Sequence, residues 1–122
     1  MQYLLLIYQN ESDWERLEPA QQTTIYQEYR ELIQRLAATE KYIAGDELKP
    51  TTTATTVRVR EGRQTITDGP FAETKEQLGG YFLVNATDLD DAIRIAAQIP
   101  SARDGSIEIR PVAVQDQAKQ AS

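Results

Sequence analysis

The 122-residue chain lacks both cysteine and histidine. The absence of cysteine excludes a disulfide framework, a thiolate nucleophile and a zinc site built on sulfur. The absence of histidine removes the commonest general base, the usual activator of a serine nucleophile and the commonest zinc and iron ligand. The sequence therefore predicts no metal site and no cofactor, and any acid–base chemistry has to use carboxylates.

Long apolar segments are also missing, since the longest run, residues 3–8, contains six residues. A helix that crosses a bilayer needs about 20 apolar residues, and no basic segment precedes this run as it would in a signal peptide. These observations predict a cytoplasmic protein that binds no membrane.

Positive charge is scarce, because 13 Lys and Arg residues face 19 Asp and Glu residues and the net charge is −6. Such a chain repels a phosphate backbone. The basic residues cluster only at Arg58, Arg60 and Arg63, and alternate arginines on a predicted hairpin are typical of a solvent-exposed face. We therefore expect no binding of nucleic acid.

The length and the 40% apolar content fit one domain with a single core. Residues 1–114 contain the segments with helix or strand periodicity. Residues 115–122 are polar and lack aromatic and β-branched side chains, which is typical of a frayed tail. The expected organisation is one domain over residues 1–114, followed by a polar C-terminal tail over residues 115–122.

The first part of the chain predicts a strand, a helix and a second strand. Residues 3–8 do not alternate polar with apolar, so this strand should be covered on both faces, as in the centre of a sheet. Pro19 suits a first helical turn, and the apolar residues after it recur at helical spacing, so a helix is predicted over residues 19–39. A short strand at residues 42–44 follows.

A β-hairpin is predicted next, because two β-branched segments within residues 55–67 flank Glu61-Gly62. A two-residue turn at this point places Val57 opposite Ile66. Glycine satisfies only one of the two positive φ angles of a type I′ turn, so a longer loop with a bulge is the alternative.

The last part predicts a strand over residues 81–84, apolar on both faces, then a helix and a final strand. The helix starts at the acidic residues that follow Thr87 and ends before Pro100. The final strand is predicted over residues 107–114. The complete order is strand, helix, strand, hairpin, strand, helix, strand.

This order is similar to an α+β, ferredoxin-like fold with an extended β-hairpin. Two helices cover only one face of such a sheet, so the other face of residues 3–8 and 81–84 would remain as a contiguous apolar patch. Packing against the same face of a second copy would cover this patch. We therefore expect a homodimer.

Residues 68–80 are the most distinctive segment, with three glycines, one proline and four ionisable side chains in thirteen positions. The Gly79-Gly80 pair should end the local structure of residues 71–78, which is either a short helical turn or an extended loop. The first three residues form a turn, because aspartate bonds nearby backbone, glycine accepts unusual φ angles and proline fixes φ.

Together with the segments MQYLLLIY at residues 1–8 and SIEIRP at residues 106–111, this segment resembles the signature of the YCII-related family, also known as the DGPF-domain family. The resemblance implies a dimeric α/β barrel. It also implies a link to stress-linked regulation, since such proteins are often encoded beside or fused to extracytoplasmic-function sigma factors. Some relatives carry a histidine and an aspartate proposed as a catalytic dyad, and this chain departs from that pattern because it has no histidine.

If residues 68–80 fold over the sheet, Asp68 and Glu73 would line a cavity with Lys75, and a lysine beside a buried carboxylate changes its proton affinity. Phe71 is expected to fill space in the core. The alternative is that the charged residues are solvated and Asp68 only shapes the turn.

Two residues outside this segment complete the predicted site. Asp46 follows Gly45 in a strand-end turn, and Arg110 lies on the polar face of the last strand, where a guanidinium group could bind an anion. The predicted pocket, for a small polar or anionic metabolite, consists of Asp46, Asp68, Phe71, Glu73, Lys75 and Arg110.

Three functions fit these residues. The first is a small-molecule-binding or stress-linked regulatory module that works as a homodimer. The second is a small enzyme that uses carboxylate acid–base chemistry in a barrel cavity, by analogy of fold alone. The third is a protein-interaction module whose cavity is filled by side chains. The lack of histidine favours the first and third, and whether the protein is an enzyme remains open at this point.

Overall fold

The computed structural model describes residues 1–113. The predicted tail, residues 115–122, and Val114 at the end of the predicted last strand lie outside these described residues. In chain order the elements are β1 (Gln2–Gln9), α1 (Glu11–Glu15), α2 (Pro19–Ala38), β2 (Tyr42–Glu47), the 3₁₀ turn η1 (Thr51–Thr53), β3 (Thr55–Arg60), β4 (Arg63–Asp68), β5 (Gln77–Asn85), α3 (Leu89–Ala97), the 3₁₀ turn η2 (Pro100–Arg103) and β6 (Ser106–Pro111).

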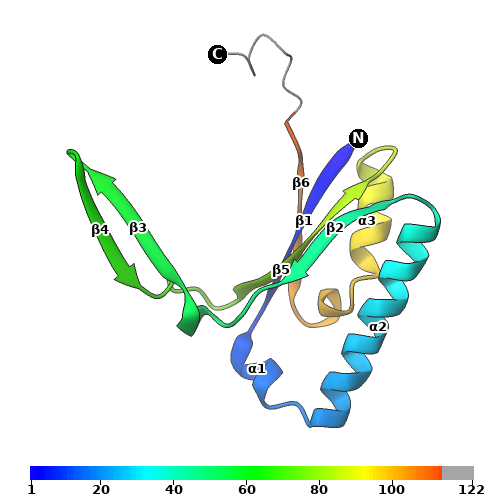
Figure 1. Cartoon of the computed structure of the whole chain (residues 1–122). Helices are drawn as coiled ribbons and strands as arrows, with labels where there is room; N and C mark the ends of the chain where they lie inside the picture. The colour runs from blue at the N-terminus through cyan, green and yellow to red at the C-terminus, as the bar shows by residue number, and fades with distance from the viewer. Residues whose placement is uncertain (114–122) are drawn as a thin grey trace.

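Four strands form one antiparallel sheet in the order β2, β5, β1, β6. The two longer helices, α2 and α3, lie on the same side of this sheet (Figure 1). The chain is therefore α+β, compatible with the ferredoxin-like fold predicted from the order of elements. β3 and β4 form a separate two-stranded sheet, the predicted hairpin, which we refer to as the arm.

β1 is central, as predicted, because it pairs with both β5 and β6. Its side chains nevertheless have two different environments. Tyr3, Leu5 and Ile7 are buried under the helices, with Leu5 0% exposed, whereas Leu4 and Leu6 point to the opposite face and are half-buried. We refer to this opposite face as the open face. The apolar side chains that β1 and β5 place on it are Leu4, Leu6, Tyr8, Leu78, Tyr81 and Leu83.

α2 confirms the predicted first helix and begins at Pro19. The Oε1 atom of Gln21 accepts the backbone N–H of Glu18 at 2.9 Å, which satisfies a donor at the start of the helix. The C-terminal half of α2 buries Leu32 and Leu36 in the core. Within residues 1–113, no helix is both long and apolar enough to cross a bilayer.

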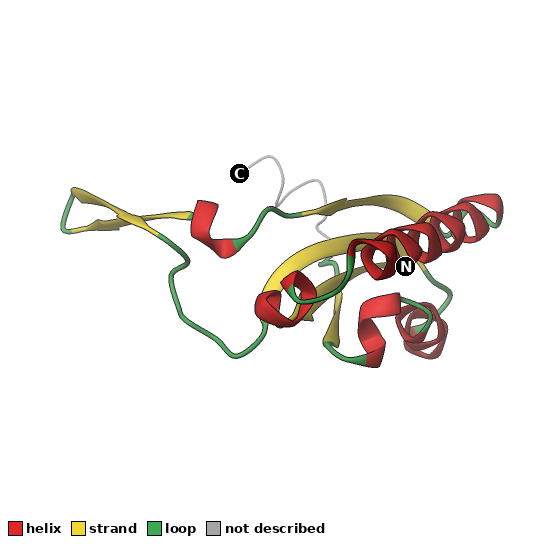
Figure 2. Cartoon of the chain, turned by 90° about the horizontal axis from the view of Figure 1, so that it is seen from below, coloured by secondary structure: helices red, strands yellow, loops and turns green. Residues whose placement is uncertain are grey.

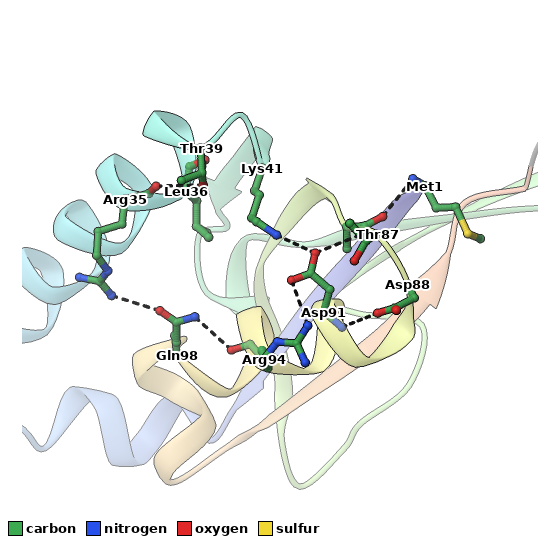
Figure 3. A network of polar contacts seen from close by, with 11 residues as sticks. Met1, Arg35, Leu36, Thr39, Lys41, Thr87, Asp88, Asp91, Arg94 and Gln98 are labelled. Atoms are coloured by element: carbon green, nitrogen blue, oxygen red, sulfur yellow. Dashed lines mark hydrogen bonds and ion pairs between the residues drawn. The ribbon is translucent and has the colours of Figure 1, made fainter.

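α3 is held to the preceding loop and to β2 by Asp91, a carboxylate that is 6% exposed. Asp88 caps the helix, since its Oδ1 accepts the Asp91 N–H at 2.9 Å. Asp91 Oδ2 in turn accepts from Lys41 Nζ at 2.7 Å and from the Thr87 N–H at 3.0 Å (Figure 3). The hydrogen bond from Lys41, followed by the one from Thr87, holds the pKa of Asp91 below its ordinary value.

The arm has the predicted register, in which Val57 opposes Ile66. Glu61 and Gly62 have φ angles of 53° and 75°, so the turn is of type I′ and the alternative with a longer loop is excluded. Figure 2 shows the arm separated from the rest of the chain. The turn residues therefore fix the register of the arm without contacts to the core.

β5 is longer than predicted, because it begins at Gln77 and runs through the Gly79-Gly80 pair. The expectation that these glycines end a local structure is therefore wrong. Gly79 lies at a bulge, and a Cβ atom on Gly80 would be 2.8 Å from the backbone oxygen of Asp46. Gly80 therefore allows β5 to approach β2 closely.

Two further differences concern short elements. β2 continues to Glu47, beyond the predicted residues 42–44. α1 was not predicted, since a five-residue helix whose one large apolar residue is Trp14 has no readable periodicity. Residues 71–76 contain no helix, so the extended loop, and not the helical turn, is the alternative that the structure confirms.

Candidate functional site

A cavity of about 630 Å³ opens on the helix-covered side of the sheet. It lies between α1, residues 22–33 of α2 and the edge formed by β2 and β5, next to the part of the core that Leu32 and Leu36 fill. We refer to it as the aromatic pocket. Its aromatic lining consists of Trp14, Tyr26, Tyr29, Tyr42 and Phe82.

Glycines on the sheet side keep this space free of side chains. Gly45, Gly79 and Gly80 line the pocket. A Cβ atom on Gly45 would lie 2.7 Å from Tyr42 Oη and 2.8 Å from the backbone oxygen of Tyr81, which is closer than real contacts permit. The pocket therefore depends on close packing of β2 on β5, where no side chain fits.

The aromatic rings pack edge to face. The ring of Phe82 lies 5.4 Å from that of Tyr42 and 6.1 Å from that of Tyr29, at interplanar angles of 86° and 81°. Trp14 and Tyr26 make a similar contact at 5.3 Å across the pocket entrance. Such pairs contribute about 0.5–1.5 kcal/mol beyond their burial, so the walls of the pocket are held in a defined arrangement.

A chain of hydrogen bonds satisfies the polar groups on the pocket floor. Ser101 Oγ donates to Gln9 Oε1 at 3.2 Å, so the Tyr29 hydroxyl, 2.7 Å away, donates to Ser101. Burial is the main reason that the pKa of Tyr29 is raised. At neutral pH the floor thus presents neutral, mutually bonded hydroxyl and amide groups.

The pocket entrance is formed by tyrosine and carboxylate groups. Tyr26 donates its hydroxyl to Glu47 Oε1 at 2.8 Å, a bond that links α2 to the end of β2. Burial, followed by the hydrogen bond and the charge of Glu47, raises the pKa of Tyr26 to about 12. Glu11 accepts from both the N–H and the hydroxyl of Thr51, each at 2.8 Å. Tyr26 therefore remains a hydrogen-bond donor at neutral pH.

Negative charge dominates around this entrance. Glu11, Glu15 and Glu47 line the pocket together with one cation of the described residues, Arg30, which leaves a formal charge of −2, while the carboxylate of Asp46, another lining residue, bonds to Tyr81 on the open face. These carboxylates are spread out, and no three acidic side chains within residues 1–113 come close enough together to hold a metal ion. The charged groups of the lining are thus mostly carboxylates, each separate from the others.

Two of the residues predicted from the sequence belong to the four-stranded sheet. Asp46 is one of the residues that line the aromatic pocket, but its carboxylate points to the open face, where Oδ2 accepts the Tyr81 hydroxyl at 3.0 Å. Arg110 on β6 lies opposite Leu4 of β1, so its side chain is on the open face. Its Nε lies 3.7 Å from Glu108 Oε2. Arg110 is therefore on the other side of the sheet from the pocket.

The other four predicted residues lie on the arm and in the loop that follows it. Asp68 ends β4, and Phe71 is 80% exposed, so it does not fill the core. Glu73 and Lys75 are exposed side chains of the loop, which is tied to the N-terminal segment by an Asn10 Nδ2 to Lys75 O hydrogen bond of 3.1 Å. Of the predicted set, a single chain thus brings only Asp46 to the lining of the aromatic pocket, and the carboxylate of Asp46 faces the other side of the sheet.

The pocket aromatics were not predicted as site residues. Tyr26 and Tyr29 lie three positions apart on one helix, and Trp14 is the only tryptophan of the chain. Periodicity marks such residues as apolar but does not distinguish the wall of a cavity from the filled core. The available signal was the grouping of aromatic residues near Gly45, in a chain with few aromatics.

Comparison with known proteins agrees with the resemblance read from the sequence. The model of the YCII-related domain family matches residues 1–115. An uncharacterized protein of Rhizobium meliloti (strain 1021) is 34% identical over 116 residues, which cover 93% of this chain and 94% of that protein. Because both matches extend over nearly the whole length, the chain belongs to the YCII-related family.

Proposed function

We propose that this YCII-related protein is a small-molecule-binding module, that its site is the aromatic pocket, and that its ligand is a protonated amine carried on an apolar or aromatic body. The observation that supports this most directly is the cavity of about 630 Å³. Ligand pockets are typically about 300–1,000 Å³, mostly apolar, with a few placed polar groups. The aromatic pocket has this size and this composition.

The aromatic lining suits the body of such a ligand. Trp14, Tyr26 and Phe82 provide apolar ring surface, and the face of an aromatic ring attracts a cation within about 6 Å. Tyr29 and Ser101 are satisfied by each other, so the floor does not require a polar ligand group. An apolar or aromatic moiety therefore fits the floor, and the charged group belongs at the entrance.

The charge at the entrance favours an amine over the polar or anionic metabolite expected from the sequence. Glu11, Glu15 and Glu47 lie there, and among the described residues only Arg30 offsets them. A carboxylate or phosphate ligand would meet like charge, whereas an ammonium group would form charge-assisted hydrogen bonds. Because Tyr26 stays protonated, the Tyr26–Glu47 pair acts in binding and not as a general base.

Trp14, the only tryptophan, makes the proposal directly testable. Fluorescence titration with 2-phenylethylamine should give a saturable change, whereas 3-phenylpropanoate, of similar shape and opposite charge, should give none. Glu47→Gln keeps an acceptor for Tyr26 and removes the charge, so it should weaken amine binding by roughly tenfold. Glu108→Gln, which removes a carboxylate outside the pocket, is the matched control.

Two results would contradict the proposal in different ways. Equal or tighter binding of the carboxylate would reject the amine as ligand class and leave the pocket as a site. If neither fluorescence nor calorimetry detects binding of either probe up to about 1 mM, the pocket is not a site for this class of ligand.

The functional unit we propose is a homodimer in which each open face is covered by the second copy. Leu4, Leu6 and Leu83 are half-buried there, and within residues 1–113 α2 and α3 pack on the other face. Light scattering at micromolar concentration should then give about twice 13.8 kDa. Ligand-dependent regulation, including the sigma-factor link implied by family resemblance, would use this dimer, and a monomer at that concentration would argue against it.

A further inference from the structure

The arm has few bonds to the rest of the chain. Among residues 1–113, its two strands pair only with each other. At its base the Gly69 N–H donates to the backbone oxygen of Ala54 at 2.7 Å, and the hydroxyl of Thr56 donates to the backbone oxygen of Gly69 at 2.8 Å. An isolated two-stranded hairpin is at best marginally stable in water. The arm therefore needs a surface to pack on.

The register divides the arm into two unlike faces. Val57, Val59 and Ile66 share one face and are 57%, 60% and 60% exposed. The alternate positions form the other face, which carries the three arginines Arg58, Arg60 and Arg63. One side of the arm is thus apolar and β-branched, and the other side is basic.

The direction of the arm indicates what covers the apolar side. Figures 1 and 2 both show the arm projecting away from α2 and α3. A second copy seated on the open face lies on this same side of the sheet. Strands of six residues extend about 20 Å, while packed sheets lie about 10 Å apart, so the arm is long enough to pass the sheet of that copy.

Charge also favours a second copy as the partner. The arm, residues 55–68, has three arginines, one glutamate and one aspartate, for a charge of +1. Since the whole chain carries −6, the remainder carries −7. Exposed charges act over about 10 Å at 0.1 M salt, so the basic side of the arm is attracted to an acidic body even without pairwise contacts.

From these observations we propose that the arm is a clasp: in the homodimer the arm of each chain lies along the second copy, with Val57, Val59 and Ile66 packed against it. This inference rests on the homodimer of the proposed function and is independent of the ligand. The arm then has a role in assembly of the dimer, and neither the aromatic pocket nor the helix-covered core depends on it.

The test compares dimer dissociation constants from sedimentation equilibrium of the full-length chain. The triple variant Val57→Thr, Val59→Thr, Ile66→Thr keeps β-branched residues and removes apolar contact, so it should raise the dissociation constant by about 10- to 100-fold. The pair Thr65→Ser, Thr67→Ser on the basic side is the control and should leave it unchanged. Circular dichroism verifies that the body of each variant is folded.

A second readout follows the arm itself. In wild type, amides of residues 55–68 should be protected from hydrogen exchange at high protein concentration and lose protection on dilution below the dissociation constant. Arg58→Gln, Arg60→Gln, Arg63→Gln should reduce the salt dependence of assembly.

Each alternative outcome has a separate meaning. A dimer whose dissociation constant the triple variant leaves unchanged, or whose arm amides stay unprotected, overturns the clasp and leaves the homodimer standing. A wild-type chain that is monomeric at about 100 μM overturns both. An arm protected in a monomer would show that it folds without a partner, which also rejects the clasp.

Discussion

The pair β1–β5 and the pair β3–β4 are both antiparallel and both rich in aliphatic side chains, yet they differ in coverage. In the first pair Leu5 and Val84 are fully buried under helices, whereas in the second Val57 and Ile66 are more than half exposed. Strand pairing itself is therefore similar in the two regions, and burial is what separates them. We therefore expect the helix-covered region to be stable within one chain and the arm to be stabilised by a partner surface.

The two regions also differ in what fixes the register of their strands. The register of β1 on β5 is fixed by side chains that must reach the core, so a slip by one residue would expose Leu5 and bury its neighbours. The register of the arm is fixed by the Glu61-Gly62 turn. The first is a tertiary constraint, and the second is a local one.

The largest effect that tests this comparison is expected at Leu5. Leu5→Ala should lower the free energy of unfolding by about 2–5 kcal/mol, because it opens a cavity in the core. Val59→Ala, measured at a concentration where the chain is monomeric, should change it by less than about 0.5 kcal/mol. Urea unfolding followed by circular dichroism measures both, and equal losses at the two positions would show that the arm belongs to the same cooperative unit as the core.

A somewhat smaller loss is expected at Asp91. Asp91→Ala removes the acceptor of the Lys41 ammonium group and of the Thr87 N–H, so it should lower the free energy of unfolding by about 2–3 kcal/mol. Asp90→Ala, which removes a neighbouring carboxylate from the same helical turn, should cost only a few tenths of a kcal/mol, roughly the effect of the helix dipole. Similar losses for both variants would mean that Asp91 stabilises the protein only through its charge near the start of α3, and not through its hydrogen bonds.

The same carboxylate predicts a dependence on pH. Its folded pKa lies below its ordinary value of 3.8 because Lys41 bonds the charged form. Its contribution to stability is therefore complete above pH 3.8 and is lost as the pH falls through the lower, folded pKa. Thermal unfolding of wild type and Asp91→Asn should differ at pH 6 and converge at strongly acid pH. A gap that stays constant with pH would mean that charge is not responsible.

The smallest effect is expected at the base of the arm. Gly69 has a φ angle of 94°, so Gly69→Ala should strain this turn by about 1 kcal/mol and raise the exchange rates of arm amides by roughly fivefold. Gly79→Ala is the control, since its φ angle is not positive and its added Cβ would make only an ordinary contact of 3.9 Å with the Ile7 oxygen. Unfolding of the core should be unaffected by Gly69→Ala, and a loss there would connect the arm to the core.

Sequence patterns identified the elements that have strong periodicity or turn chemistry. The non-alternating run of β1, the spacing along α2 and the Glu61-Gly62 turn each determined an element correctly. The uniform run could not show which of Leu5 and Leu6 lies under the helices, because both are leucine. The course of β5 was missed at Gly79-Gly80, because Gly79 lies at a bulge and Gly80 is required by the close approach of β2, and neither marks a turn.

The aromatic pocket was harder to predict than the fold. It brings Trp14 of an unpredicted helix to Tyr26 of α2 and to Glu47, beyond the predicted end of β2. These contacts join segments distant in sequence, so no local pattern contains them. Asp46 was predicted because a carboxylate after glycine at a strand end indicates a site. Residues 68–80 were predicted to form part of a site because of their unusual composition. In a single chain most of them lie on the surface.

The hydrogen bond between Gly69 and Ala54 means that the chain enters and leaves the arm at nearly one point. The intervening residues are thus a side branch between β2 and β5, inserted without altering the order or register of the four-stranded sheet. Such a branch can be lengthened, shortened or exchanged while the rest of the molecule keeps its shape. We therefore expect that the arm can be exchanged for another hairpin without rebuilding the four-stranded sheet, provided that Leu48 and Pro50, which line the cavity, are kept.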